Sequence, residues 1–299
     1  MRDSGSKSRV PYIYGWMGRS FLNRRRRGSI EVGLGTVLAT SMATTLSDRP
    51  KYSLIIPAYN EGQRITVTLD KVLAYIGRQA WNAEIIVVDD GSRDETPEIV
   101  RQYAERHPAV HLLQNPGNRG KGYSVRHGML NARGDLLLFS DADLSSPIEE
   151  SAKLFSALAE GAEVAIGSRW LRSELQTERQ PFYRQLFGRA FNLYLRLLLG
   201  LNFKDTQCGF KAFTAEAART LFPRQKIERW GFDPELLFLA RKFGLPVREV
   251  AVEWAHDDRT KISYVKDGLQ MGMESLRVRW YSLSGQYRRE LTQCAVNQV

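Results

Sequence analysis

From Lys51 onward, the chain alternates short, unbroken apolar runs with longer amphipathic stretches, and this alternation limits the folds that it can adopt. Strands that read as continuous apolar runs are typical of parallel sheets, which helices cover on both faces. The apolar runs predict five strands, over residues 53–56, 84–88, 110–113, 136–139 and 164–166. Apolar residues at helical spacing predict helices over 62–76, 94–106, 120–132 and 147–160. We therefore expect an α/β fold with a Rossmann-like, mostly parallel central sheet flanked by helices.

The second half of the chain is less regular. Its patterns predict helices over 181–199, 214–222, 233–243 and 264–283, a strand over 247–252, and a strand or tight loop over 205–213. The helices over 181–199 and 264–283 carry aromatic, leucine, methionine and arginine residues. This composition fits a helix at a membrane interface, and it fits a helix packed on the domain core equally well.

The positive charge of the chain lies at its two ends. The formal net charge is +10, from 43 lysine and arginine residues against 33 acidic ones. Residues 1–50 hold nine basic and three acidic residues, residues 259–299 hold seven and three, and the part between them is neutral. A nucleic-acid enzyme more often carries its charge across the body, so we expect no nucleic-acid partner. Basic ends suit an anionic membrane surface, or are plain solvated charge.

The first fifty residues differ in composition from the rest. A run of four arginines, Arg24 to Arg27, precedes a stretch rich in glycine, serine, threonine and alanine, without the strong apolar core of a signal peptide. We expect residues 1–50 to be a basic, disordered extension, and Met42 is an alternative start. No run of 18 or more apolar residues occurs, so we expect no transmembrane helix. The two cysteines, Cys208 and Cys294, exclude a disulfide scaffold.

Polar residues follow the five predicted strands of the first half, at the point where each strand ends. They are Tyr59 to Glu61, Asp89 and Asp90, Asn115 to Lys121, Asp141 to Asp143, and Arg169. Ligands of open α/β sheets bind outside the carboxyl ends of the strands. These positions therefore predict a ligand site at one edge of the sheet.

Asp141-Ala142-Asp143 supplies two carboxylates directly after a buried strand. Such a pair can hold one hard cation, because Mg²⁺ or Mn²⁺ needs few protein oxygens when a diphosphate supplies the others. The cation then offsets the negative charge that grows on a leaving diphosphate. The alternative is a pair of loop carboxylates that cap the next helix.

Two further loops carry polar groups suited to a nucleotide. Asp89 and Asp90 can accept a hydrogen bond from a base N–H or a ribose hydroxyl, or they can shape the turn, and the pair offers an acid for each role. The glycine-rich stretch 115–122 is not a Walker A loop, because Gly122 follows Lys121 where serine or threonine should stand. It can present Lys121 and backbone N–H groups to a phosphate at a helix N-terminus, or be a flexible turn.

Several motifs together resemble a known family. In chain order they are SLIIPAYNE (53–61), VVDDGSRDET (87–96), NRGKG (118–122), DADLSSP (141–147) and GSR (167–169). This ordered set resembles inverting family-2 glycosyltransferases with a GT-A fold. In the second half, DTQCGFK (205–211), RWGFDPELL (229–237) and VAVEW (250–254) resemble dolichyl-phosphate glucosyltransferases and their bacterial polyprenyl-phosphate relatives. The resemblance implies a GT-A catalytic domain over 51–255, followed over 256–299 by an acceptor loop and an amphipathic C-terminal helix.

The resemblance also implies roles for individual residues. Asp141 and Asp143 are expected to face the diphosphate and hold Mg²⁺ or Mn²⁺, and Asp143, Arg169 and Lys261 are expected to be catalytic. The acceptor phosphate is expected at Arg169, Arg259 and Lys261, although Arg259-Thr260 stands where the family usually has Gly-Ser. The nucleotide sugar is expected to contact Pro57, Tyr59, Glu61, Asp89, Asp90, Lys121, Asp141, Gln207, Gly209, Lys211 and Asp233, with Glu235 on the same helix facing the sugar pocket.

The activity implied by the resemblance is transfer of glucose from UDP-glucose to dolichyl or polyprenyl phosphate. Inversion at the anomeric carbon would give a β-linked glycosyl phospholipid, made by a peripheral protein at the cytoplasmic face of a membrane. Three alternatives stay open: mannosyl transfer from GDP-mannose, a soluble acceptor such as a polysaccharide with Asp233 as base, and a non-catalytic nucleotide-binding adaptor. The last is disfavoured because both DAD acids, the basic loops and the DDGS turn are intact.

Overall fold

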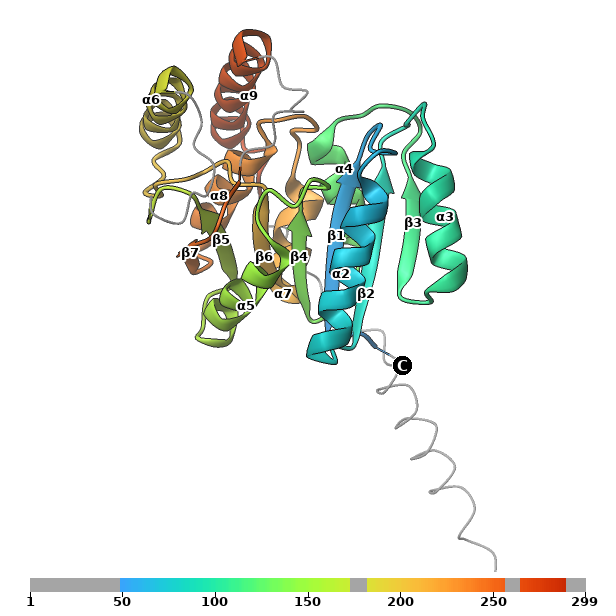
Figure 1. The fold of residues 1–299 in the computed structure, drawn as a ribbon. Coiled ribbons are helices and arrows are strands. Elements are labelled where there is room, and N and C mark those ends of the chain that lie inside the picture. The colour runs from blue at the N-terminus through green and yellow to red at the C-terminus, as the bar shows by residue number, and fades with distance from the viewer. Residues whose placement is uncertain (1–48, 173–181, 256–263, 289–299) are drawn as a thin grey trace, which may run out of the picture. The chain divides into compact units, whose positions relative to one another are not determined.

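The structure is a computed structural model that describes residues 49–172, 182–255 and 264–288 (Figure 1). The extension expected over residues 1–50 therefore lies almost wholly outside the described residues. The same is true of Arg259 and Lys261, the two basic residues expected to hold the acceptor phosphate from the loop before the last helix.

A seven-stranded sheet forms the centre of the described chain, in the order β3-β2-β1-β4-β6-β5-β7. Its strands are β1 (Tyr52–Ala58), β2 (Ala83–Asp89), β3 (Val110–Gln114), β4 (Leu136–Ser140), β5 (Val164–Ser168), β6 (Phe210–Thr214) and β7 (Val247–Ala251). Every pairing is parallel except the two that β6 makes with β4 and β5. The expected mostly parallel central sheet is confirmed. The segment expected as a strand or tight loop over 205–213 is both: a loop to Gly209, then β6.

Helices lie on both faces of the sheet, as predicted (Figure 1). They are α2 (Ile65–Gln79), α3 (Thr96–Arg106), α4 (Lys121–Asn131), α5 (Ser151–Ala159), α6 (Phe182–Leu199), α7 (Ala215–Leu221), α8 (Phe232–Phe243) and α9 (Tyr264–Leu283). The helix predicted over 147–160 is divided, because a 3₁₀ turn (Ile148–Glu150) precedes α5. Among the residues that the structure covers, no helix is both long and apolar enough to cross a bilayer.

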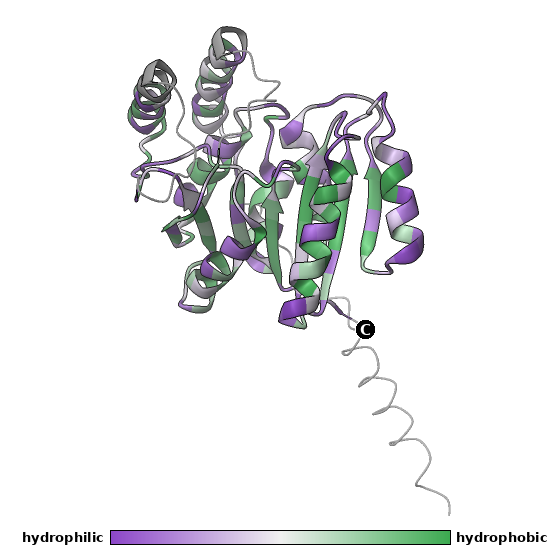
Figure 2. Cartoon of the chain, in the orientation of Figure 1, coloured by the Kyte–Doolittle hydropathy of each residue, from purple (hydrophilic) through white to green (hydrophobic). Residues whose placement is uncertain are grey.

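Two apolar clusters, one on each face of the sheet, hold these layers together. Leu69 of α2, Val100 of α3 and Leu154 of α5 pack in one cluster. Val125 of α4 and Leu236 of α8 pack in the other, with residues of α6, α7 and α9. In Figure 2 the strands are apolar along most of their length, whereas the helices combine apolar and polar residues. Burial of β1, β2, β4 and β5 on both faces is what their apolar runs predicted, whereas the edge strand β3 is only partly buried.

The strand directions bring the predicted polar residues to one edge of the sheet. β1 to β4 run parallel, and β5 runs in the same direction because both β4 and β5 are antiparallel to β6. The carboxyl ends of these five strands therefore meet at the same edge. Phe210, the first residue of β6, pairs with Ser140, so the loop before β6 reaches this edge too.

Candidate active site

Asp141 of the DAD motif is held between a lysine and a glycine. Lys121, the first residue of α4, brings its Nζ within 2.5 Å of Asp141 Oδ1. A Cβ atom added to Gly209 would lie 2.2 Å from Asp141 Oδ2, so the carboxylate can lie against the backbone of the loop only because residue 209 is glycine. Burial alone would lower the pKa of Lys121, but Asp141 and Asp233 outweigh it and raise that pKa. Lys121 therefore stays protonated and carries its positive charge close to Asp141 and Asp233.

The surroundings of Asp143 disfavour the charged form of its carboxyl group. Its Oδ1 accepts a hydrogen bond from the Ser145 N–H at 2.9 Å, and its Oδ2 lies 4.0 Å from Nη1 of Arg64. Burial, and after it the neighbouring Asp141, raises the pKa of Asp143. The protein environment thus disfavours the ionised form, and a bound cation would favour it.

The two DAD carboxylates fit a divalent cation that shares its shell with phosphate oxygens. In the described ranges, no group of three or more histidine, cysteine, aspartate or glutamate side chains is arranged to hold a metal. Mg²⁺ usually keeps several waters and is bound by one or two carboxylates plus substrate phosphates. Asp141 and Asp143 supply that number of donors.

A buried ion pair between Lys211 and Asp233 supports the site. Lys211 of β6 has no exposed surface, and its ammonium group bonds to Asp233 and to the carbonyl of Cys208. Burial raises the pKa of Asp233, while Lys211 and Lys121 act against this rise. The sequence predicted that Lys211 shapes the sugar pocket. In the structure Lys211 fixes Asp233 and the loop before β6, and its role toward a sugar stays a prediction.

Asp90 organises the glycine-rich loop. Its Oδ1 accepts hydrogen bonds from Asn115 Nδ2 at 2.8 Å and the Arg119 N–H at 2.9 Å, and its Oδ2 accepts one from the Gly120 N–H at 2.8 Å. Gly120 has a φ of 110°, and a Cβ atom there would lie 2.7 Å from the Glu228 carbonyl oxygen. Both oxygens of Asp90 are engaged within the protein, which matches the turn-shaping role that the sequence left open for one acid of the pair.

The other acid, Asp89, and the loop after β1 lie next to this turn. Asp89 is almost fully buried, and its Oδ1 accepts a hydrogen bond from the Ser92 N–H at 3.1 Å. The Asn60 N–H donates to Ser92 Oγ at 2.8 Å, and Arg64 forms an ion pair with Glu61 at 2.6 Å. These contacts link the loops after β1 and β2, so Tyr59 and Glu61 lie at the predicted edge, as does Pro57 near the end of β1.

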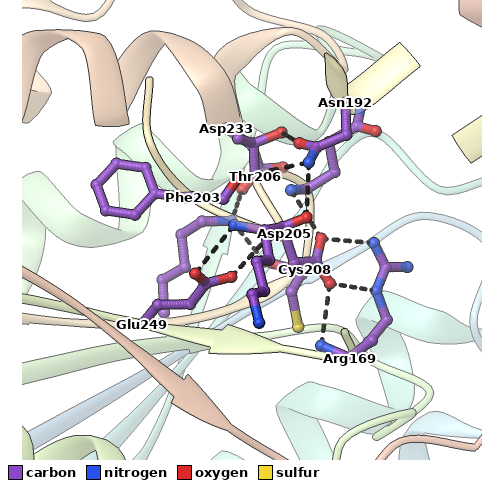
Figure 3. Close-up of polar contacts among 11 residues, drawn as sticks. Arg169, Asn192, Phe203, Asp205, Thr206, Cys208, Asp233 and Glu249 are labelled. Atoms are coloured by element: carbon purple, nitrogen blue, oxygen red, sulfur yellow. Dashed lines mark hydrogen bonds and ion pairs between the residues drawn. The ribbon is translucent and has the colours of Figure 1, made fainter. Parts of the chain in front are cut away.

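Arg169 forms a two-pronged ion pair with a residue that sequence reasoning left without a role. Its Nε lies 2.6 Å from Asp205 Oδ2 and its Nη2 lies 2.8 Å from Asp205 Oδ1 (Figure 3). The Arg169 N–H also donates to Asp205 Oδ2 at 3.1 Å. Burial would lower the pKa of Arg169, but Asp205 outweighs it and raises that pKa. The sequence held one signal for Asp205, which is Arg169 itself, because an arginine that is mostly withdrawn from solvent needs a carboxylate partner.

Asp205 also fixes the loop before β6. It accepts a hydrogen bond from the Gln207 N–H at 3.2 Å. The N–H groups of Lys204 and Asp205 in turn donate to the carboxylate of Glu249 on β7, at 2.9 and 2.7 Å (Figure 3). Gln207 turns its side chain toward α9, with Nε2 3.8 Å from the sulfur of Met271. Contacts with Arg169, Glu249 and Met271 therefore hold the loop that carries Gln207 and Gly209.

Glu235 does not face the site. Its carboxylate accepts hydrogen bonds from the N–H groups of Lys226 and Ile227, at 2.8 and 2.9 Å, and from the hydroxyl of Tyr287. Glu235 does lie in the first turn of α8, as expected, but at about 100° per residue its side chain points away from that of Asp233 and bonds within the protein. Burial raises the pKa of Glu235 to about 7, although the three donors act against this rise.

This pKa predicts a pH-dependent stability. Because the folded state raises the pKa of Glu235 from 4.5 to about 7, the folded protein should lose stability as the pH rises through that window. The expected loss from this group is roughly 3 kcal/mol at most. Glu235→Gln should flatten this part of the profile, as measured by urea unfolding at pH 5 and pH 7.5. The exposed Glu98→Gln is the control, and equal slopes for both variants would contradict the prediction.

Comparison with known proteins gives the site its family. The family model "Glycosyl transferase family 2" matches residues 53–222. A dolichyl-phosphate beta-glucosyltransferase of Trichomonas vaginalis is 42% identical over 78% of this chain and 72% of its own length. The Drosophila melanogaster and Homo sapiens proteins of the same name are 40% and 34% identical, over 82% of this chain and 79% and 80% of theirs.

Solved structures support the fold at lower identity. Glucosyl-3-phosphoglycerate synthase from Mycobacterium tuberculosis has a TM-score of 0.58 and 19% identity, covering 86% of each chain. Its structures hold UDP with Mn²⁺ or Mg²⁺. Mannosyl-3-phosphoglycerate synthase from Rubrobacter xylanophilus has a TM-score of 0.57 and 18% identity, covering 86% of this chain and 81% of its own. The expected GT-A fold is confirmed, and the chain belongs to glycosyl transferase family 2.

Proposed function

We propose that this protein transfers glucose from UDP-glucose to dolichyl or polyprenyl phosphate, with inversion, to give a β-linked glucosyl phospholipid. The observation that carries the proposal is the meeting of the DAD carboxylates, Lys121 and Arg169 at one edge of the sheet, in a chain 34–42% identical to dolichyl-phosphate beta-glucosyltransferases. The acids suit the donor diphosphate with its metal, and the basic residues suit phosphates.

The acceptor chemistry removes the need for a general base. A phosphate monoester has a second pKa near 6, so the acceptor is already largely dianionic at neutral pH and can attack the anomeric carbon directly. This agrees with the surroundings of Asp233, the candidate base for a soluble acceptor, whose carboxylate is bonded to buried Lys211. A residue held in this way supports the site and does not need to take a proton.

The residues of the chain would act by position and charge. Asp141 and Asp143 would hold Mg²⁺ or Mn²⁺, which when bound offsets charge on the departing diphosphate. Lys121, already next to Asp141, would add a second positive charge at the same place. Arg169, oriented by Asp205, would face the phosphates of donor or acceptor. In-line positioning and electrostatic stabilisation of departing UDP account for the acceleration.

A lipid acceptor places the reaction at a membrane surface. We expect a peripheral protein at the cytoplasmic face of that membrane, with Arg259 and Lys261 near the acceptor phosphate. These two residues lie outside the described parts of the chain, so their role is carried by the resemblance of the motifs around them.

A transfer assay tests the function. Purified protein is given radiolabelled UDP-glucose or GDP-mannose, polyprenyl phosphate in detergent, and Mg²⁺ or Mn²⁺, and the label in the organic phase is counted. We expect label from UDP-glucose only, lost when the cation is chelated. Label only from GDP-mannose would overturn the sugar and keep the mechanism. Absence of lipid label, with slow release of glucose, would indicate a soluble acceptor instead.

A further inference from the structure

The exposed apolar side chains of the described chain are concentrated on two helices. Nine large apolar residues are exposed in the described parts of the chain. Seven of them belong to α6 or α9, and the other two are Val67 and Leu130. The seven are Leu193 and Leu197 on α6, and Leu269, Met273, Leu276, Trp280 and Leu283 on α9. Scattered apolar residues are normal on a protein surface, whereas a concentration of them marks an interaction site.

Both helices have a second apolar face, which is already used. Leu195 and Leu199 of α6 and Val278 of α9 are buried in the core cluster on that side of the sheet. A helix at the surface of a globular domain needs only one apolar stripe, which faces the core. The exposed stripes are therefore additional to what packing requires. On α9 the exposed residues recur at intervals of four and three, so they form one continuous stripe along the helix.

The two helices lie side by side and run in the same direction (Figure 1). The Tyr194 hydroxyl donates a hydrogen bond to the Gly272 carbonyl at 3.2 Å, which joins the middle of both helices. Their C-terminal ends meet the same end of α8, because Arg241 bonds to the carbonyl of Gly200 just after α6 and Lys242 bonds to Ser282 of α9.

This arrangement puts the two exposed stripes on one side of the pair. At about 100° per residue, Leu193 and Leu197 lie about 60–100° to one rotational side of Tyr194. The α9 stripe lies about 20–100° to the opposite rotational side of Gly272. For two parallel helices in contact, opposite rotations away from the contact lead to the same side. We call this surface, made by the seven exposed apolar residues, the α6–α9 face.

Basic residues flank the α6–α9 face. Arg189, Arg196 and Lys204 line a hollow of about 310 Å³ with Leu193 and Trp170 at its wall. Among the residues that the structure describes, no acidic side chain lines this hollow. On the other helix Arg277 is exposed beside the apolar stripe. An apolar stripe bordered by arginines is complementary to the interface of a bilayer that carries anionic headgroups.

We propose that the α6–α9 face docks on the surface of an anionic lipid bilayer, with its apolar residues below the headgroups and Arg189 and Arg196 among them. The inference rests on the proposed function, since a lipid-linked acceptor requires the site to approach a bilayer. Gln207 contacts α9 from the loop that carries Gly209, so the docked helices are next to the loop on which Asp141 rests.

Vesicle binding of the full chain, without any substrate, tests the apolar part. Leu197→Gln with Leu283→Gln removes two side chains that are 77% and 76% exposed. We expect binding to phosphatidylcholine vesicles that contain phosphatidylserine to fall at least about tenfold. Val67→Gln with Leu130→Gln, at exposed positions on α2 and α4, is the matched control and should bind like the wild type. Equal binding by both double variants would overturn the proposal.

The basic part has its own variant. Arg189→Gln with Arg196→Gln should lower binding to the anionic vesicles about tenfold and leave binding to pure phosphatidylcholine vesicles unchanged. Arg78→Gln with Arg101→Gln, two exposed arginines of α2 and α3, is the control. If the wild type instead dimerises through this face, light scattering will show a dimer that Leu197→Gln with Leu283→Gln dissociates, and the bilayer proposal is overturned.

A soluble acceptor separates this inference from the proposed function. The Leu197→Gln and Leu283→Gln double variant should transfer glucose to a short-chain, water-soluble prenyl phosphate at the wild-type rate, and lose transfer to long-chain acceptor in vesicles. Failure of the wild type with both acceptors would refute the function while the vesicle-binding result still stands. Loss of transfer to the soluble acceptor in the double variant would count against the docking role.

Discussion

Asp143→Asn should reduce the transfer rate by about 10²- to 10³-fold or more while the protein stays folded. The carboxylate follows β4, and burial together with Asp141 disfavours its charge in the absence of a cation. Asparagine keeps the shape and the Ser145 contact but cannot neutralise a cation. Because the folded state raises the pKa of Asp143, its charge costs stability at neutral pH, and the variant should be at least as stable as the wild type without metal.

The control for this variant lies at the other end of the same strand. Asp135 directly precedes β4 and is exposed, with Arg49 3.3 Å away, so Asp135→Asn removes the same charge far from the site. Calorimetry should show Mn²⁺-dependent UDP binding by the wild type and Asp135→Asn, and its loss in Asp143→Asn. An Asp143→Asn protein with near-normal transfer and Mn²⁺-dependent UDP binding would refute the metal role.

The sequence was sufficient to predict the parallel part of the sheet and its polar edge. Unbroken apolar runs such as 85–88 have few alternatives to a strand buried on both faces, and parallel direction then brings the strand ends together. Asp141, Asp143 and Lys121 could be placed together for that reason before any coordinates. The 2.5 Å contact joins Lys121 to Asp141, whose carboxylate also lies against Gly209 in the loop before the antiparallel strand β6.

The sequence was insufficient where contacts join distant segments through an antiparallel strand. Nothing in the segment 205–213 indicates that β6 inserts between β4 and β5. That insertion buries Lys211 beneath Asp233 and brings Asp205 to Arg169, and none of these pairs is close in the chain. Residues that support a site by ion pairing can therefore be identified only from the three-dimensional structure. This holds even for Asp205, which lies inside the motif DTQCGFK.

Helix spacing alone also left the role of α6 and α9 undecided between core packing and a membrane interface. The structure shows that each helix has both kinds of face, because Leu195 is buried while Leu193, two positions earlier, is exposed. A composition rich in leucine and arginine cannot separate these cases. The contact between Tyr194 and Gly272 fixes how the two helices are rotated, and therefore which of their residues face the core and which face outward.

Asp205→Asn should destabilise the protein by about 3–5 kcal/mol, the cost of leaving one member of a buried ion pair without its partner. Asp205 is 2% exposed, binds Arg169 through both oxygens, and accepts backbone N–H groups on either side of the site. Transfer should fall as well, since Arg169 loses the contact that orients it. Urea unfolding at neutral pH measures the first effect and the transfer assay the second.

Three further variants, one of them Arg169→Met alone, decide whether this loss belongs to the buried pair. Glu160→Gln breaks an exposed arginine–glutamate pair with Arg248 on β7, and should leave stability nearly unchanged because solvent already screens that pair. Arg169→Met combined with Asp205→Asn removes both charges. If the Arg169–Asp205 contact carries the effect, the double variant should be more stable than the sum of the two single losses predicts. Strictly additive losses would mean that Asp205 acts through the backbone of the loop before β6, and that Arg169 owes its orientation to other contacts.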